Sequence, residues 1–266
     1  MAAQTAALIS SHLSDRRRSL PAWGLPLGLM SAFIVAIFPS VEDSISKVVN
    51  RYPTGLKEAF GIGQLSNVEQ YLHAEMLSLI VPLALGYLAV RAVGSGLAGA
   101  AESGRLDVLL SAPVSRRRLC AAGFLATAIE LAAVLAIAYL LTMLGSVLAG
   151  AGLAAGPAAA GFAGVWPLAL LFAGLGIVAC AFSLRTSVVT GAVAGVLVGM
   201  YVADLIGKLD PSFDWLRYAS VFRYYGNAIE DGIEPIAFGG VTLGACALAM
   251  FGAWMFDRRD LSGGRQ

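Results

Sequence analysis

One ionisable side chain lies deep inside an apolar stretch of this sequence. Glu130 follows Arg118 by twelve residues in a stretch from 119 to 148, which places it about 18 Å along a helix. A carboxylate at that depth in hydrocarbon is costly, so it is by default a candidate functional residue. Glu130 could line a path through a membrane and hold a cationic group of a transported molecule. It could equally be a structural acid, neutral or paired with the hydroxyl of Thr127 or Thr142.

Other residue types that perform chemistry are sparse. The three cysteines, Cys120, Cys180 and Cys246, have spacings that suit neither a metal site nor a disulfide framework, so we expect small buried side chains. The two histidines, His12 and His73, are far apart and have no cysteine partner. An intramembrane protease or acyltransferase would need a histidine facing a carboxylate on a neighbouring helix, and both histidines lie outside the apolar stretches. The sequence therefore predicts no catalytic residue and no metal ligand.

A nucleotide-binding loop is missing from the sequence. The pattern G-x-x-x-x-G-K-[ST] needs a glycine five residues before its Gly-Lys pair and a hydroxyl residue after it. Around Gly207-Lys208, these positions hold Val202 and Leu209. We therefore expect no cofactor in this chain, so that any ATP and Mg²⁺ would be bound by a separate polypeptide.

The elements that position these residues are apolar stretches of helical length. Of the 266 residues, 58% are hydrophobic and 13% are charged, and the mean hydropathy is +0.76. Soluble domains carry about 25% charged residues, so this composition excludes an ordinary water-soluble enzyme and a disordered chain. A bilayer core of about 30 Å needs about 20 helical residues. Six stretches reach or approach this length: 21–38, 74–93, 119–148, 161–182, 187–206 and 235–256. The sequence thus predicts an all-α polytopic membrane protein, with residues 1–266 forming a single transmembrane domain.

The basic residues predict the orientation of the six spans. If the N-terminus is cytoplasmic, 12 of the 18 Lys and Arg residues lie on the inner side, including the clusters 16–18, 116–118 and 258–259. Positive residues favour the cytoplasmic side, so both termini are expected in the cytoplasm and the protein in the inner membrane of the cell. No A-x-A-like cleavage site follows the first stretch, so we expect an uncleaved helix there.

Two segments on the expected outer side, 39–73 and 207–234, are too long for simple turns, and we expect them to contain helices. The second is rich in aromatic residues, which are typical of the membrane–water interface. Asp204, near the outer end of the fifth span, is expected to reach this interface. Stripes of small residues, such as 24/28/32 and 191/195/199, either pack the subunit internally or line a dimer seam.

The inner segment between the second and third spans, 94–118, contains an amphipathic pattern. Ser103 can cap the start of a short helix. Pro113 disfavours a helical conformation at the preceding residue and so ends this helix. Three leucines at helical spacing give this helix one apolar face: Leu106, Leu109 and Leu110. Ser115 can cap the third span.

This inner segment resembles a known family signature. Residues 102–117 read E-S-G-R-L-D-V-L-L-S-A-P-V-S-R-R, which is similar to the pattern E-x-G-T-L-D-L-L-L-S-x-P-V-S-R of the type-2 ABC exporter permeases. Weaker similarities to the family occur at 52–72, 215–225 and 256–261, and all four places have the order that the family shows. The resemblance therefore covers essentially the whole chain. Arg105 and Val221 depart from the family, which usually has a small polar residue and a proline there, and they leave the subfamily open.

The resemblance implies a six-span permease that pairs with a second permease subunit, identical or homologous, and with two cytoplasmic ATPase subunits. Its inner helix would be the coupling helix that docks into a groove of the ATPase, with Glu102 and Asp107 at the rim. The coupling residues would be Glu102, Arg105, Leu106, Asp107, Leu109, Leu110 and Pro113. A helix lying on lipid is the alternative, but it would favour Lys or Arg on the polar face, where this sequence also has acids.

The function that follows is a permease of an ATP-driven exporter, which forms the translocation path while another chain hydrolyses ATP. The alternative is an ion- or proton-coupled secondary transporter, a class that often shows internal repeats, and no convincing repeat is present. Three aromatic residues would help to seal the outer mouth or, equally, would be interfacial anchors: Phe222, Tyr224 and Tyr225. We expect contact with membrane lipids and none with nucleic acid. The sequence does not select among drugs, antibiotics, lipids and peptides as substrate.

Overall fold

The computed structural model describes residues 17–49, 67–104 and 115–258, and every regular element in these ranges is helical. Six helices are long and apolar enough to cross a membrane. They are α2 (Ser19–Val49), α5 (Ile80–Glu102), α7 (Arg116–Ala149), α8 (Ala155–Phe182), α9 (Thr186–Leu209) and α13 (Pro235–Asp257). The second span also includes α4 (Val68–Leu72) and the π-helix η1 (His73–Leu77). The predicted all-α fold with six spans is confirmed.

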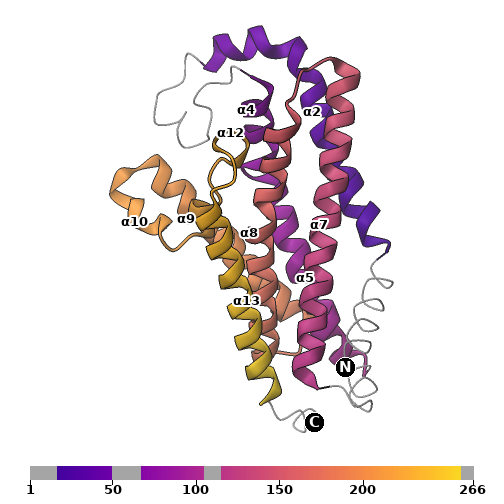
Figure 1. The fold of residues 1–266 in the computed structure, drawn as a ribbon. Helices are drawn as coiled ribbons and strands as arrows, with labels where there is room; N and C mark the ends of the chain where they lie inside the picture. Colours follow the sequence, from indigo (N-terminus) through magenta and orange to yellow (C-terminus); the bar gives the residue numbers. More distant parts are fainter. Residues whose placement is uncertain (1–16, 50–66, 105–114, 259–266) are drawn as a thin grey trace.

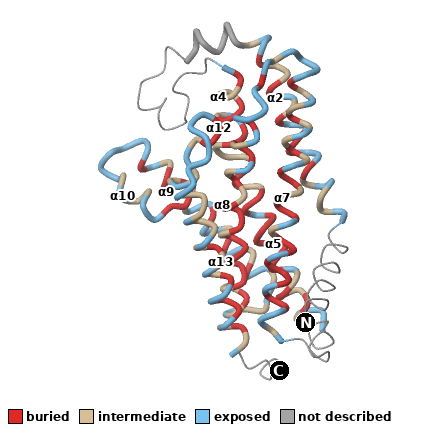
Figure 2. The backbone as a smooth tube through the Cα atoms, in the orientation of Figure 1, coloured by how far each residue is buried: buried red, intermediate tan, exposed pale blue. Residues whose placement is uncertain are grey.

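Helix α8 lies at the centre of the bundle (Figure 1). It packs against α13, α5, α7 and α9, while α2 packs on α7 and α5 packs on α9. The sequence of α8 has no charged, hydroxyl or amide side chain, so it can be covered on all sides without burying such a group. Helices α5 and α8 are accordingly largely buried, whereas α13 is exposed along much of its length (Figure 2).

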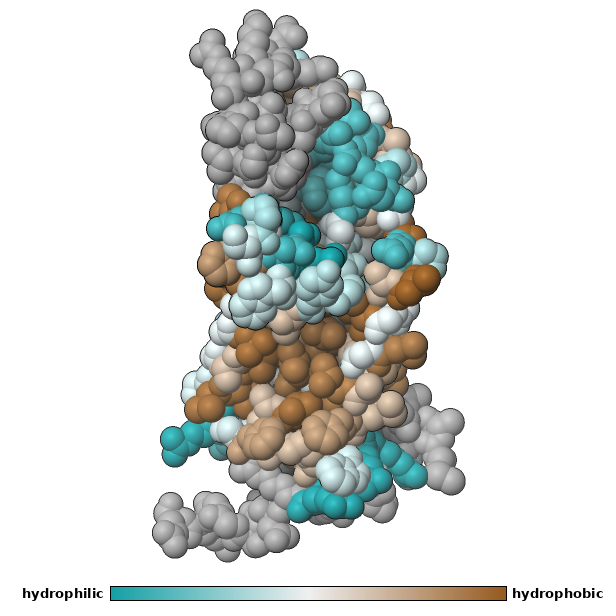
Figure 3. Space-filling view, turned by 90° about the vertical axis from the view of Figure 1, so that its left-hand side faces the viewer, coloured by the Kyte–Doolittle hydropathy of each residue, from teal (hydrophilic) through white to brown (hydrophobic). Residues whose placement is uncertain are grey.

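The exposed faces of α9 and α13 are apolar. The large exposed side chains on these two helices include Val188, Val196, Val202, Ile236, Leu243, Met250 and Phe251. Seen from this side, the surface carries an apolar belt with polar side chains above and below it (Figure 3). A belt of this kind matches the hydrocarbon layer between two polar interfaces. The chain is therefore a multi-pass membrane protein.

Glycines bring α2 and α7 into close contact. A Cβ on Gly28 would lie 2.7 Å from the side chain of Leu141 and 3.0 Å from the backbone of Ala138, which is closer than carbon atoms tolerate. The stripe 24/28/32 therefore packs inside the subunit. The stripe 191/195/199 on α9 does not, because no described atom lies within 4 Å of a Cβ built on any of its three glycines.

The inner segment differs from its sequence prediction. Residues 94–102, expected between spans, continue helix α5. Gly94 and Gly99 lie against α9, where an added Cβ would come within 3.3 Å of Thr190 and 3.5 Å of Thr186. This close packing offsets the low helix propensity of glycine. Ser103 therefore follows the end of α5 instead of starting a new helix, and its hydroxyl donates to the Gly99 carbonyl at 2.7 Å.

Two further helices, α2 and α8, extend by six residues or more beyond their predicted limits. Helix α2 continues past Phe38 and through Pro39, and its last part turns across the top of the bundle (Figure 1). Proline removes one helix hydrogen bond and bends the helix, so a proline can lie inside a helix that changes direction. Helix α8 begins six residues before its predicted start, with Pro157 in its first turn, where proline is tolerated.

The aromatic segment 207–234 contains helices, as expected. After the end of α9 these are η2 (Pro211–Phe213), α10 (Asp214–Arg217), α11 (Val221–Tyr225) and α12 (Ala228–Asp231). We call the end of the bundle where α5 ends and α7 begins the inner end, because the basic residues predict that it faces the cytoplasm. Segment 207–234 connects α9 to α13 on the other side of the apolar belt.

Candidate functional site

Glu102 joins two spans at the inner end of the bundle. It is the last residue of α5, and its carboxylate accepts hydrogen bonds from the backbone N–H of Thr186 at 3.1 Å and from the Thr186 hydroxyl at 2.7 Å. Thr186 begins α9, where the N–H groups lack helix partners and carry partial positive charge, so a carboxylate is stabilised there. Residues 105–114 therefore begin three positions after a residue that holds the start of α9.

Helix α7 begins as the sequence predicts. The Ser115 hydroxyl accepts a hydrogen bond from the backbone N–H of Arg118 at 3.4 Å and caps the helix. Arg117 Nε forms an ion pair with Asp257 at 2.9 Å, which ties the start of α7 to the end of α13. The other predicted coupling residues lie outside the described residues: Arg105, Leu106, Asp107, Leu109, Leu110 and Pro113.

Glu130 is buried inside the bundle, with 1% of its surface exposed. The prediction that it faces protein instead of lipid is confirmed. Thr142, one of the two partners considered from sequence, lies twelve residues along the same helix, or about 18 Å away, and is too far. Thr127 lies one turn away, and its hydroxyl donates to the Gly123 carbonyl at 2.9 Å. In this conformation Glu130 is closed off from any open path.

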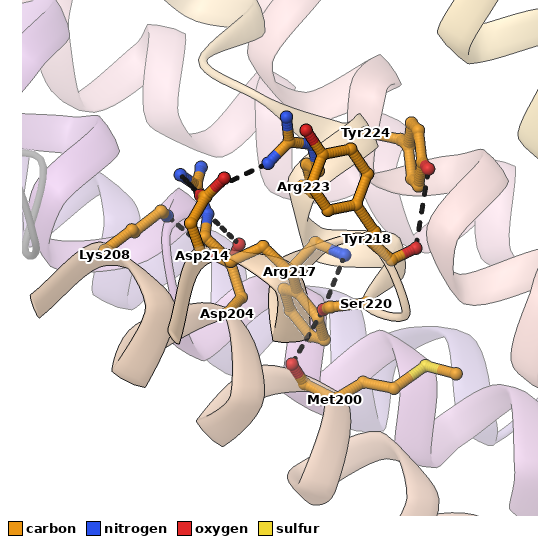
Figure 4. A network of polar contacts seen from close by, with 10 residues as sticks. Met200, Asp204, Lys208, Asp214, Arg217, Tyr218, Ser220, Arg223 and Tyr224 are labelled. Atoms are coloured by element: carbon orange, nitrogen blue, oxygen red, sulfur yellow. Dashed lines mark hydrogen bonds and ion pairs between the residues drawn. The ribbon is translucent and has the colours of Figure 1, made fainter. Parts of the chain in front are cut away.

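A charge network holds segment 207–234 on α9 (Figure 4). Asp204 is 3% exposed and pairs with Lys208 Nζ at 2.8 Å and with Arg217 Nε at 3.2 Å. Arg217 Nη1 also reaches Asp214 at 3.0 Å, and Arg223 reaches the same oxygen at 3.4 Å. These partners satisfy the charge of Asp204 within the protein, and its position at the membrane–water interface stays a prediction. In the sequence, the i, i+4 spacing of Asp204 and Lys208 could have indicated one of these ion pairs.

The three predicted gate residues lie on α11 in different environments. Phe222 is 5% exposed and packs edge-on against Tyr201 of α9, with ring centroids 5.4 Å apart. Tyr224 is 47% exposed. The ring of Tyr225 packs against α8 where Gly164 leaves room, since a Cβ there would lie 3.4 Å from the ring. Phe222 therefore anchors α11 to the bundle, and a sealing role for the three residues stays a prediction.

Hydrogen bonds from Ser220 reinforce this anchor. The Ser220 hydroxyl donates to the Met200 carbonyl on α9 at 2.7 Å and accepts from the backbone N–H of Phe222 at 3.2 Å (Figure 4). The same residue thus caps α11 and ties it to a span. Movement of α9 would move α11 with it.

A cavity of about 110 Å³ opens between α8, α13 and the turn from α11 to α12. Among its lining residues, the Tyr225 hydroxyl and Asn227 Oδ1 are buried and have no hydrogen-bond partner among the described residues. Burial raises the pKa of Tyr225, so its hydroxyl stays protonated. Phe238 of α13 also lines the cavity. Phe238 also lines an apolar groove of about 300 Å³ between α7, α8 and α13.

No three His, Cys, Asp or Glu side chains within the described ranges are grouped so that they could hold a metal ion. The buried ionisable groups include Glu130, Asp204 and His73, which lie on different elements; His73 belongs to the second span, so the expectation that both histidines lie outside the spans is wrong.

The comparisons with known proteins agree with this geometry. No curated protein matches the chain. The family model described as the C-terminal domain of the multidrug efflux system permease Rv1217c matches residues 12–257, which include all six spans. This match is consistent with the resemblance to ABC exporter permeases. The chain belongs to the family of this multidrug efflux permease domain and is a membrane transport permease.

Proposed function

We propose that this chain is the membrane-spanning subunit of an ATP-driven exporter in the cytoplasmic membrane, working with two separate ATPase subunits and a second permease subunit. The observation that carries the proposal is the family match across all six spans, joined to a sequence without a nucleotide-binding loop. A permease of this kind needs a motor on another chain. ATP and Mg²⁺ would bind there, and none of the residues named here would take part in hydrolysis.

Motion would enter the permease through residues 105–114. The amphipathic leucine pattern in this segment supports docking into a groove. The ends of the segment adjoin contacts that reach other spans: Glu102 holds the start of α9, and Arg117 holds the end of α13. A displacement of the segment would therefore act on α5 and α7 directly and on α9 and α13 through these two contacts.

Opening of a path would then expose Glu130. This carboxylate is closed off in the described conformation, and it lies on α7, which packs against α2, α8 and α13. If the coupling segment shifts α5 and α7 relative to α8, Glu130 becomes available to a cationic group of the cargo. The word "multidrug" in the family's description supports a cargo of apolar or amphiphilic small molecules.

The second permease subunit would pack on α9. The stripe 191/195/199 on this helix meets no described atom, and α9 is one of the least buried spans. Small residues let helices approach closely in lipid, which favours a protein partner at this face.

The proposal is tested by placing a charge on the apolar face of the predicted coupling helix. Leu109→Asp puts a carboxylate into an apolar groove, where desolvation without a partner is unfavourable by several kcal/mol. The change lies outside the spans, so the permease should still insert. We expect loss of ATPase co-purification and of ATP-dependent transport in proteoliposomes. Asp107→Lys, at the rim, is the matched control and should have a smaller effect because rim charges remain solvated.

If Leu109→Asp binds its ATPase and transports like the parent, residues 105–114 are not the coupling element. If the parent chain alone moves a dye on an imposed ion or proton gradient, with no ATPase present, it is a secondary transporter. These two results separate a misplaced coupling segment from a wrong transport class.

A further inference from the structure

Two residues that line the cavity between α8, α13 and the α11–α12 turn, Tyr225 and Asn227, each carry a buried polar atom without a hydrogen-bond partner among the described residues. Asn227 Nδ2 donates to Glu230, and since a carboxylate only accepts, the amide must keep this orientation. Its Oδ1 is therefore a buried acceptor without a described partner, and the Tyr225 hydroxyl, which can both donate and accept, has none either. Buried polar groups of this kind are normally satisfied, so a ligand that supplies the missing hydrogen bonds would be stabilised here.

The charge around this cavity is negative. Asp231 and Glu234 line it on the exposed side, and neither forms an ion pair within the described residues. Arg223 also lines the cavity, but its charge is already engaged by Asp214 and it lies 3.9 Å over the ring of Tyr218. The local charge thus favours a cation over an anion.

The groove next to this cavity is apolar and aromatic. It is lined by side chains from α7, α8 and α13, including Tyr139, Phe162, Trp166 and Phe238. Phe238 lines both spaces, and its ring stacks on Trp166 with centroids 6.3 Å apart. One aromatic side chain, Phe238, therefore borders both the polar cavity and the apolar groove.

We propose that the cavity and the groove together bind an amphiphilic amine, with the ammonium group in the cavity and the apolar body in the groove. An ammonium has only donors, which matches the acceptors of Tyr225, Asn227 and the two carboxylates at the exposed side. The rings of Tyr225 and Phe238 add a favourable cation–π environment. The amine could come from an aminophospholipid or from a soluble amphiphile, because both carry the same head chemistry.

Binding at this site goes beyond the proposed transport function and does not require ATP or a partner subunit, so it is measured on the full chain alone. The probe is 12-bromododecylammonium, added to the protein in phosphatidylcholine nanodiscs. Its bromine quenches the fluorescence of Trp166 in the groove, and Trp166→Phe identifies the part of the signal that comes from this site. The neutral comparison is 12-bromododecanol, which offers the same apolar body without the charge.

We expect the ammonium to bind at least about tenfold more tightly than the alcohol, because charged hydrogen bonds and two nearby carboxylates act only on the ammonium. The variant Asp231→Asn/Glu234→Gln and the variant Tyr225→Phe should each lose most of this difference while binding the alcohol unchanged, which shows that they fold. Asp210→Asn, an exposed acid that does not line the cavity, is the control and should keep the difference.

Equal affinity for ammonium and alcohol would overturn the proposal, as would the same ammonium affinity in the parent and in both variants, or quenching that survives Trp166→Phe. Addition of phosphatidylethanolamine to the nanodiscs identifies the source of the amine. Competition would support a lipid headgroup as the natural occupant, and undiminished binding of the probe would support a soluble amphiphile.

Discussion

Asp204 is the buried charge whose partners are best defined, so its removal gives the sharpest stability prediction. The change Asp204→Asn keeps the shape of the side chain and removes its charge. It breaks the ion pair with Lys208 at 2.8 Å, which lies within α9, and the pair with Arg217 at 3.2 Å, which joins α9 to α10. We expect the short helices of segment 207–225 to open more often from the bundle.

The size of the effect follows from the burial of the partners. Removing one member of a fully buried pair destabilises by about 3–5 kcal/mol. Here Arg217 keeps Asp214 at 3.0 Å, and the side chain of Lys208 is 37% exposed and regains water. The loss should therefore be smaller, about 2 kcal/mol, or a factor of about 30 in the local opening equilibrium.

Hydrogen–deuterium exchange in detergent or nanodiscs measures this opening residue by residue. Amides of 211–225 should exchange about 30-fold faster in Asp204→Asn, while those of α8 stay unchanged. Asp210→Asn is the control, because asparagine replaces aspartate as a helix cap at almost no cost. If exchange in Asp204→Asn equals that of the parent, the network does not hold the segment and the reasoning from burial is refuted.

Three further predictions test other contacts. Glu102→Ala removes both hydrogen bonds to Thr186. In proteoliposomes with the partner ATPase, we expect this variant to hydrolyse several-fold more ATP per molecule transported. Glu102→Gln should show a smaller increase because it keeps a hydrogen-bond acceptor. Glu130→Gln should insert and elute as a single species in size-exclusion chromatography, whereas Glu130→Leu should aggregate or lose yield if its polar contacts hold α7 in place. Gly28→Leu should lower stability by about 1–3 kcal/mol in a thermal-shift assay, because α2 must move away from α7. Gly240→Leu on α13, with open space around it, is the control and should change little; equal losses in both would show that the α2–α7 packing is not specific.

The spans were predictable because apolarity is a local property of the sequence. Twenty consecutive apolar residues have few alternatives to a membrane helix, and the order of the six spans followed directly. The capping role of Ser115 was predictable for the same reason, since a cap depends only on its own next turn.

The ends of the spans and the polar contacts depended on residues far away in the chain. Residues 94–102 were expected between two spans, but contact of Gly94 and Gly99 with Thr190 and Thr186 of α9 stabilises helix there. The pairing of Asp204 with Arg217 was not predictable, because Arg217 comes thirteen positions later in a segment whose path was unknown. Phe222 was expected to be a gate residue or an interfacial anchor, and only the packing of α11 on α9 shows that it is buried against Tyr201.

The wholly apolar sequence of α8 bears on how the chain is made. Spans enter the membrane in the order of synthesis, so α8 is in place before α13 exists. A Cβ on Gly174 would lie 2.7 Å from the Ala245 carbonyl, which shows how tightly α13 later covers this face. Until then the face is in contact with lipid tails, and it has no charged, hydroxyl or amide side chain that hydrocarbon would solvate poorly. Helix α8, which packs against four other spans, can therefore remain stable in the membrane before α13 is made. Docking of α13 can then complete the bundle after release from the ribosome.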